Sequence, residues 1–298
     1  MLRKIRTAAV TAAACTVLGA GLVGCDDSTG EDFDPFASTP KPAAGSFTGT
    51  KTLEIGGKSL NVSCSGKAAD GTPVIVLLHG AGDGVDKMAA LQKTLSAKNR
   101  VCSYDRLGAG KSDKPDGPQD FASTGKVLTG LIDQVAGDAP VVLAGHSLGG
   151  LIAARYAPEH KDTVKGVVLL DATPPTMGAE ITRIIPASAK GPAGQVRAQN
   201  VAMFKGQNPE QLVIKDGKVA SAGDIPVEVV KHGQPYLAAV PQYGPSLERA
   251  WTDGQSKWLE LSSKSSLRVA KKSGHYIYKD QPEAAVQSIQ RVATQAAR

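Results

Sequence analysis

The chain has 298 residues, which suits one large α/β domain or two small ones. Its hydrophobic content is 41% and its charged content 21%, so the chain can bury a sizeable core and is not of the disordered class. The formal net charge is +6, but no basic cluster with interleaved aromatic residues occurs, which argues against nucleic acid as a partner.

Residues 1–24 are predicted to be a bacterial lipoprotein signal peptide. Basic residues are followed by an apolar, alanine-rich stretch and then by small residues, which is the order of a secretory signal. The sequence LVGC at residues 22–25 resembles the lipobox, in which a signal peptidase cleaves before a cysteine that carries lipid. Residues 7–23 are short for a spanning helix, which needs roughly 20 apolar residues. We expect lipid on Cys25 to anchor the exported protein to the outer face of the bacterial cell membrane; a plain signal peptide or a short membrane anchor is the alternative.

Residues 25–45 are predicted to form a flexible tether, because they are acidic and rich in Ser, Thr, Pro and Gly. Their carboxylates do not have the spacing of a metal site, and we expect the protein to use no metal or other cofactor. The folded domain is expected over residues 46–298, as a monomer.

After the tether, predicted strands and helices alternate. Residues 49–55 and 58–64 flank a Gly-Gly pair and predict a β-hairpin. Residues 72–80 form an apolar run that ends in His79-Gly80, typical of a strand buried on both faces. Further strands are predicted within residues 99–110, 139–147 and 164–175, and helices at residues 86–97, 121–137 and 148–157. This alternation predicts a mostly parallel sheet covered by helices on both faces.

Residues 174–224 interrupt the alternation with a polar stretch rich in Gly and Pro. Because a structureless loop of that length is unusual in a compact domain, we predict an inserted lid with short helices, whose apolar residues mostly pack against the body. Strands then follow within residues 224–233 and 265–275, and a helix at residues 283–295. Between the two strands, Leu247, Trp251, Trp258 and Leu261 are expected to share one helix face.

The segment Gly145-His146-Ser147-Leu148-Gly149 has the pattern G-x-S-x-G and lies between a predicted strand and a predicted helix. That context is the one required of a nucleophile elbow, a sharp turn on which the serine is exposed and its neighbours are small. The N-terminus of the following helix directs free N–H groups towards the serine. We therefore predict that Ser147 is a catalytic nucleophile; a structural turn serine is the alternative.

Four segments resemble the α/β-hydrolase fold family in its branch of serine esterases, lipases and related acyl hydrolases. In the order that the family has them, they read LLHGAGDG at residues 77–84, YDRLGAGKSD at 104–113, GHSLGG at 145–150 and SGHYIYKDQPE at 273–283. The resemblance covers roughly residues 50–298 and is weakest over the predicted lid. It implies an α/β-hydrolase fold, and a serine at position 147 argues against the epoxide-hydrolase and haloalkane-dehalogenase branches, which use an aspartate there.

His275 is predicted to be the general base. In this fold the base follows the nucleophile in chain order, which disfavours His79 and His146. His160 follows the elbow helix, and His232 ends a strand where the family places no base. His275 comes just after the last predicted strand, where it would take the serine proton and later give one to the leaving group. We expect the other four histidines to be surface or core imidazoles.

The acid that orients His275 has two possible positions in the family. The usual one is the loop after the strand IPVEVV, but here that loop, residues 231–246, contains no Asp or Glu. The other is the end of the preceding strand, where Asp171 follows four apolar residues. We predict that Asp171 is the acid. Asp253 is the alternative, and Glu248 is expected on the same helix as Asp253. Without a catalytic role, Asp171 would be a helix cap or a turn residue.

The resemblance also implies an oxyanion hole made by the backbone amides of Ala81 and Leu148. A second glycine-rich segment, GAGKS at residues 108–112, suggests a phosphate-binding loop, but such a loop requires glycine where this chain has Asp105. We therefore reject nucleotide binding. No H-E-x-x-H pattern or Cys/His cluster in the sequence indicates a metal.

Two of the four cysteines are predicted to form a disulfide. Cys15 lies in the predicted signal peptide and Cys25 would carry the lipid. The remaining pair, Cys64 and Cys102, is even in number in an exported protein, which favours a disulfide. The fold implied by the resemblance sets their two strands side by side. Two buried free thiols are the alternative.

Together these features predict a serine hydrolase that cleaves carboxylic esters of a small-molecule acyl substrate through an acyl-enzyme. The same triad could instead cleave amides or peptides, or catalyse a cofactor-free perhydrolase-like reaction. A non-catalytic surface binding module is an alternative of a different class, although such a module has no need of both Ser147 and His275.

Overall fold

The computed structural model describes residues 47–297. The predicted signal peptide, Cys25 and the predicted tether lie outside these residues. Within the described residues, no helix is both long enough and apolar enough to span a membrane.

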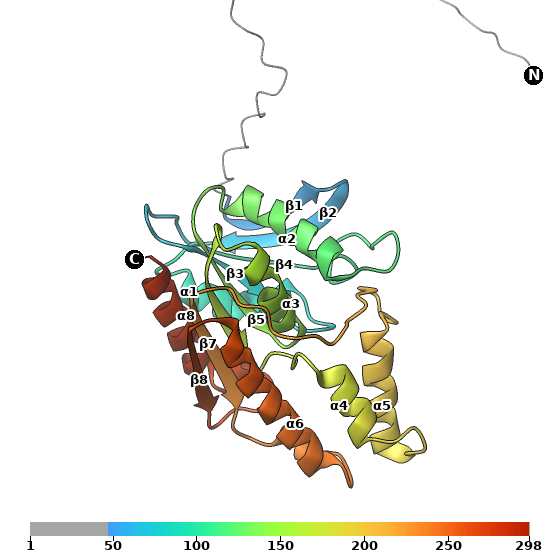
Figure 1. The fold of residues 1–298 in the computed structure, drawn as a ribbon. Coiled ribbons are helices and arrows are strands. Elements are labelled where there is room, and N and C mark those ends of the chain that lie inside the picture. Colours follow the sequence, from blue (N-terminus) through green and yellow to red (C-terminus); the bar gives the residue numbers. More distant parts are fainter. Residues whose placement is uncertain (1–46, 298) are drawn as a thin grey trace, which may run out of the picture. The chain divides into compact units, whose positions relative to one another are not determined.

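The centre of the fold is an eight-stranded sheet with the order β1-β2-β4-β3-β5-β6-β7-β8 (Figure 1). The first two strands form an antiparallel hairpin, β2 pairs antiparallel with β4, and the other neighbours are parallel. The strands are β1 (Gly49–Ile55), β2 (Lys58–Ser65), β3 (Val74–Leu78), β4 (Val101–Tyr104), β5 (Val141–His146), β6 (Val164–Leu170), β7 (Pro226–His232) and β8 (Lys264–Ala270). The predicted mostly parallel sheet is therefore confirmed.

Helices cover both faces of this sheet. The helices are α1 (Val85–Leu95), α2 (Phe121–Val135), α3 (Leu148–Tyr156), α4 (Met177–Ile184), α5 (Gly191–Phe204), α6 (Gly244–Lys257), α7 (Ile277–Asp280) and α8 (Pro282–Ala296). Three short 3₁₀ turns are η1 (Ala157–Glu159), η2 (Tyr236–Ala239) and η3 (Trp258–Leu261). Apolar residues of α1, α7 and α8 join one core cluster, whereas those of α2, α3, α4 and α6 join the other.

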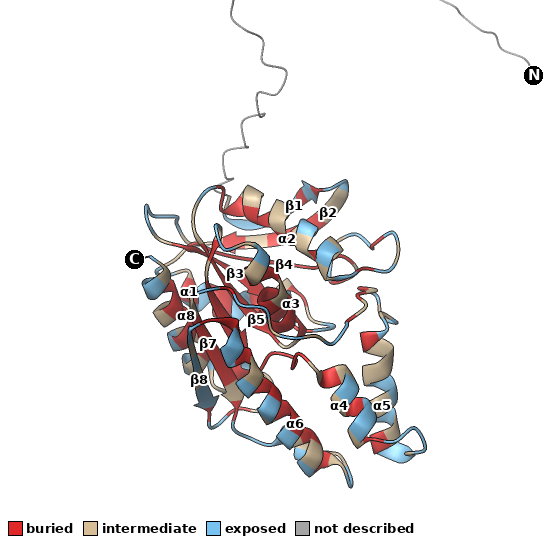
Figure 2. Ribbon diagram, viewed as in Figure 1, coloured by how far each residue is buried: buried red, intermediate tan, exposed pale blue. Residues whose placement is uncertain are grey.

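The central strand β3 is buried on both sides because it is apolar at every position. All five residues of β3 are buried, and Val74, Val76 and Leu78 face one core cluster while Ile75 and Leu77 face the other. Figure 2 shows buried residues along the central strands and on the inner faces of the helices. Full burial of one such side chain stabilises the fold by about 1.5–3 kcal/mol. This layering fixes the carboxyl ends of β5, β6, β7 and β8 at one edge of the sheet.

The segment 174–224 connects β6 to β7 and contains α4 and α5, which lie side by side (Figure 1). Its apolar residues pack against the body: Met177, Ile181, Ile185 and Phe204 are buried, and Ile184 and Met203 are half-buried against the same cluster. After β7, the sequence predicts one helix face with four apolar residues. That prediction is wrong in its second half, because α6 ends at Lys257 and the chain tightens into η3, which buries Trp258 and Leu261.

Cys64 and Cys102 form a disulfide between β2 and β4, as predicted. They lie opposite each other in the antiparallel register, with Cα atoms 4.1 Å apart, and both are buried. The neighbouring strands that the family resemblance implied are thus present.

Loss of this disulfide is expected to destabilise the fold. The bond joins residues separated by 38 positions, and closing a loop of that length stabilises a protein by about 3–4 kcal/mol in the chain-entropy model. We expect the double variant Cys64→Ala/Cys102→Ala to lose about that free energy of unfolding in a urea titration. Parent protein under reducing conditions is the control. Mass spectrometry that finds two free thiols in exported, non-reduced protein would reject the pairing.

Candidate active site

Ser147 lies at a sharp turn between β5 and α3. Its backbone has φ 50° and ψ −118°, a conformation that costs a non-glycine residue roughly 1–3 kcal/mol. Backbone hydrogen bonds hold the turn: Ser147 N donates to Leu170 O at 3.1 Å, and Ser147 O accepts from Thr173 N at 3.0 Å. A Cβ on Gly145 would lie only 2.4 Å from the backbone of Gly149. The turn therefore has the strain and the small neighbours that a nucleophile elbow requires.

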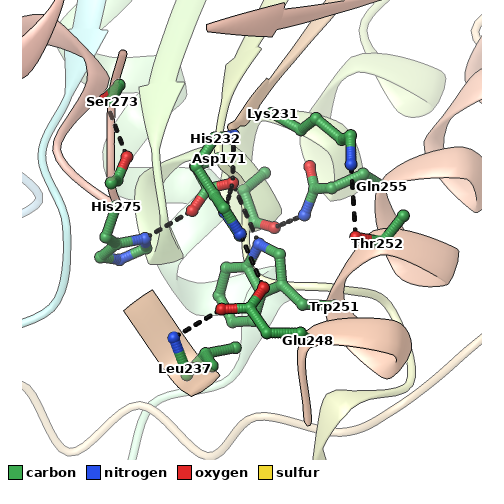
Figure 3. A network of polar contacts seen from close by, with 12 residues as sticks. Asp171, Lys231, His232, Leu237, Glu248, Trp251, Thr252, Gln255, Ser273 and His275 are labelled. Atoms are coloured by element: carbon green, nitrogen blue, oxygen red, sulfur yellow. Dashed lines mark hydrogen bonds and ion pairs between the residues drawn. The ribbon is translucent and has the colours of Figure 1, made fainter. Parts of the chain in front are cut away.

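Asp171 follows β6 directly, at the same edge of the sheet as Ser147. Its side chain is fully buried, and its backbone also has a positive φ of 46°. His275, which follows β8, donates from Nδ1 to Asp171 Oδ2 at 2.7 Å (Figure 3). The structure therefore joins the predicted acid to the predicted base by a short hydrogen bond.

The second oxygen of Asp171 accepts three further hydrogen bonds. His232 Nδ1 lies 2.8 Å from Oδ1, His232 N lies 3.1 Å away, and Trp251 Nε1 lies 3.0 Å away. Burial alone would raise the pKa of Asp171, but the hydrogen bonds and charges of His232 and His275 outweigh it and lower the pKa to about 2. Asp171 is therefore a buried carboxylate that stays ionised at neutral pH.

His232 and Glu248 extend this network, and the sequence analysis assigned neither of them a place in it. His232 Nε2 lies 2.9 Å from Glu248 Oε2, and Glu248 Oε1 accepts from the backbone amides of Leu237 at 2.6 Å and Ala238 at 3.2 Å (Figure 3). One signal was available in the sequence. Asp171 follows one strand and His232 ends the next, so their side chains emerge at the same edge if the two strands are neighbours.

The other two carboxylates that the sequence analysis named, the alternative acid Asp253 and Glu248, lie elsewhere. Glu248 lies on α6 as predicted, but its carboxylate contacts His232, not His275. Asp253 is exposed on the same helix. Of the three carboxylates that the sequence offered, the structure brings Asp171 to His275.

Aromatic rings surround His275, whose side chain is 21% exposed. The rings of Tyr236, Trp251 and Tyr276 have centroids 5.1, 5.5 and 5.5 Å from its imidazole. His146, the residue before Ser147, lies closer at 4.6 Å and donates from Nε2 to His275 O at 3.0 Å. Burial lowers the pKa of His146 to about 3, so its ring is neutral. This contact ties the turn that carries Ser147 to the loop that carries His275.

The structure does not join the Ser147 hydroxyl to His275 by a hydrogen bond within the described residues. Catalytic hydrogen bonds are often long or poorly aligned in enzymes without substrate. Within the candidate triad, the hydrogen bond between His275 and Asp171 is therefore present and the one between Ser147 Oγ and His275 is not. Ser147 and His275 nevertheless lie at the same edge of the sheet.

Arg106 holds the loop after β3 by hydrogen bonds to its backbone carbonyls. The buried guanidinium donates to His79 O at 2.6 Å and to Gly80 O at 3.0 Å, and it pairs with Glu210 through two hydrogen bonds of 2.7 and 3.0 Å. His79 donates from Nδ1 to Gly80 O at 2.7 Å. Burial and the nearby Arg106 lower the pKa of His79, which keeps its ring neutral. His79 is therefore a buried imidazole that supports its own loop.

The remaining candidates have structural positions. Ala81 is exposed at the turn after Gly80, and Leu148 is the first residue of α3. A Cβ on Gly149 would lie 2.3 Å from Leu78 O, so the first turn of α3 packs directly on the end of β3. His160 stacks on Tyr156 with ring centroids 3.7 Å apart, away from this network.

Asp105 explains why the GAGKS segment does not form a phosphate cradle. Its carboxylate accepts from the backbone amides of Val85 at 2.7 Å and Lys111 at 2.9 Å, and from the Asn61 side chain at 2.8 Å. A Cβ on Gly110 would lie 2.0 Å from that carboxylate. The amide that would face a phosphate in a binding loop is therefore directed at an internal anion.

Comparison with known proteins places this arrangement in context. A model described as the alpha/beta hydrolase fold matches residues 73–202, which include Ser147 and Asp171. A thermophilic esterase from Thermogutta terrifontis superposes with a TM-score of 0.58 at 17% identity, over 84% of this chain and 99% of that one. The protein has the α/β-hydrolase fold. An epoxide hydrolase from hot-environment metagenomes superposes with a TM-score of 0.61 at 16% identity, over 83% of this chain and 98% of that one, so the fold does not by itself select the chemistry.

Among curated proteins, the human (lyso)-N-acylphosphatidylethanolamine lipase is 33% identical to this α/β-hydrolase-fold chain over 161 residues. The match covers 53% of this chain and 45% of the human protein. The chain thus matches less than half the length of this relative.

Proposed function

We propose that the protein is a serine hydrolase that cleaves carboxylic esters with Ser147 as nucleophile, His275 as general base and Asp171 as the orienting acid. The observation that carries this proposal is the 2.7 Å hydrogen bond between His275 Nδ1 and the buried Asp171 carboxylate, at the same sheet edge as the strained Ser147. The partial match to a human lipase supports the same reaction class.

The chemistry follows from these positions. Asp171 fixes the His275 tautomer that carries its proton on Nδ1, which leaves Nε2 free to accept the Ser147 proton. The Ser147 oxygen then attacks the ester carbonyl carbon, and the protonated His275 gives its Nε2 proton to the departing alkoxide, which leaves as the alcohol. In the second half, His275 takes a proton from water, whose oxygen attacks the acyl-enzyme, and returns that proton to Ser147 as the acid departs.

The backbone amides of Ala81 and Leu148 would bind the oxyanion in this proposal. Arg106 supports the role of Ala81, because Gly80 O and the Ala81 N–H belong to one planar peptide unit and point in opposite directions. Arg106 and His79 both donate to Gly80 O, which fixes that unit from its carbonyl side. A guanidinium on the carbonyl also polarises the peptide and strengthens its N–H as a donor.

Ester cleavage is favoured over a binding module by the backbone of Ser147. The strained turn and the buried Asp171–His275 pair both carry a free-energy cost. Such costs are expected at a reacting site and have no use on a binding surface. Amide or peptide cleavage and a perhydrolase-like reaction use the same triad and are outcomes of the substrate test.

A fluorophosphonate probe is expected to label the folded protein at Ser147, because the probe reacts with a serine only where a base activates it. Peptide mapping should place the label at Ser147, and heat-denatured protein should stay unlabelled. Hydrolysis of p-nitrophenyl esters of increasing chain length, compared with the matching anilides, then defines acyl length and ester preference. A folded protein that does not label and cleaves none of these compounds would leave the binding module as the better account.

A further inference from the structure

We propose that His232 is a positioning residue that holds Asp171 from the side opposite His275 as a doubly protonated imidazolium. The proposal rests on the proposed function in one respect, because His232 would act on the reaction through Asp171 and His275. It goes beyond a Ser-His-Asp triad, since it adds a second histidine and a second carboxylate, Glu248, to the charged system (Figure 3).

The two hydrogen bonds of the His232 ring determine how many protons the ring carries. His232 Nδ1 lies 2.8 Å from Asp171 Oδ1, and His232 Nε2 lies 2.9 Å from Glu248 Oε2. An ionised carboxylate only accepts hydrogen bonds, so each ring nitrogen must carry a proton. With both nitrogens protonated, the His232 ring is a cation between two anions.

Both carboxylates have surroundings that suit their ionised forms. Asp171 accepts four hydrogen bonds, from His275, from His232 twice and from Trp251. Glu248 accepts two backbone amides on Oε1 and His232 on Oε2. Hydrogen bonds to a charged form favour that form. The proton in the His232–Glu248 contact therefore belongs on the imidazole.

The groups around His232 favour the protonated, positively charged form of its ring. Burial lowers the pKa of His232. The hydrogen bonds and charges of Asp171 and Glu248 raise it by more than burial lowers it, so the net pKa lies above the usual value. The Tyr236 ring packs edge-on at 4.9 Å. Three more charged side chains line the surface hollow of about 370 Å³ that His232 shares with Glu248: Lys231, Arg249 and Asp253. Because the pKa is raised, the positive charge is complete below the usual pKa of histidine and is lost as pH rises through the raised value.

This arrangement gives His232 two effects on the candidate triad. Its Nδ1–H anchors one oxygen of Asp171, so the other oxygen stays directed at His275. Its charge offsets part of the negative charge that His275 experiences, which limits how strongly Asp171 stabilises the protonated form of His275. The second effect would be absent if His232 had only a packing role, so it distinguishes the two roles.

The variant His232→Asn tests the second effect by itself, since its amide can replace Nδ1–H as a donor to Asp171 but has no charge. We expect the acidic limb of the pH profile of kcat/KM to move to higher pH, on the order of one unit, because protonated His275 is then better stabilised. KM should change little. The matched control is His160→Asn, which removes a histidine outside the network and should leave the limb in place. An unmoved limb in folded His232→Asn protein would overturn the electrostatic role.

A second measurement needs no activity. In Ser147→Ala protein, the His232 ring followed by NMR should titrate above the usual value of about 6.5 and should be doubly protonated at pH 6. Glu248→Gln removes one anion and should lower that midpoint. A single neutral tautomer of His232 at pH 6 would refute the proposal. Because the NMR result does not depend on turnover, it distinguishes failure of this proposal from failure of the proposed function, and it also applies if His232→Asn does not fold.

Discussion

Ser147→Ala is expected to lower the rate of ester hydrolysis by several orders of magnitude and to leave the fold intact. The variant removes the proposed nucleophile, whereas the proposed oxyanion hole and substrate binding would keep a residual rate above that of water. The backbone of Ser147 makes the hydrogen bonds that hold the turn, and its Oγ makes none within the described residues. Alanine therefore removes a reacting group without removing a structural contact.

The measurement is kcat/KM on a p-nitrophenyl ester, together with the urea midpoint of the same sample. Ser188→Ala is the matched control, because Ser188 is exposed in the segment between α4 and α5. It should behave like the parent in both assays. An alanine variant at position 147 that is well folded and turns over at nearly the parental rate would show that Ser147 is not the nucleophile.

The parts of this fold that the sequence predicts depend on local pattern. The apolar run before Ser147 predicts a buried strand, and the small residues after it predict a sharp turn into a helix; the structure has both. The family resemblance implied that β2 and β4 are neighbours, and the Cys64–Cys102 pair joins these two strands. Period and turn chemistry are properties of neighbouring residues, so they can be recognised without coordinates.

The parts that the sequence did not predict depend on contacts between distant segments. Arg106 and Glu210 are 104 positions apart, and nothing local to either residue indicates the other. The sequence around His232 does not indicate its two partners either, because Asp171 follows β6 and Glu248 lies on α6. A buried charge needs a partner, so each of these residues could be suspected of pairing, but the identity of the partner is fixed by strand register and helix packing.

Asp171→Asn is expected to reduce kcat by up to about 10,000-fold while the protein remains folded. The direction follows from which oxygen faces which donor. Oδ1 faces three donors, namely His232 Nδ1, His232 N and Trp251 Nε1, so the amide oxygen of the asparagine should occupy that place. The amide nitrogen then faces His275 Nδ1 and donates to it. His275 must carry its remaining proton on Nε2, where it can no longer accept the proton of Ser147.

Asp253→Asn provides the comparison, because Asp253 was the alternative acid and is exposed on α6. This variant should keep nearly the parental rate. Both variants are assayed for kcat on one ester across pH 5–9.

The pKa of about 2 keeps Asp171 ionised over that whole range, so the parent should show no loss of activity from protonation of this group. Its stabilising contribution is present above the ordinary aspartate pKa and is lost only as pH falls towards 2. A large loss in Asp253→Asn with a small loss in Asp171→Asn would transfer the orienting role to Asp253, and the 2.7 Å contact between Asp171 and His275 would then be structural only.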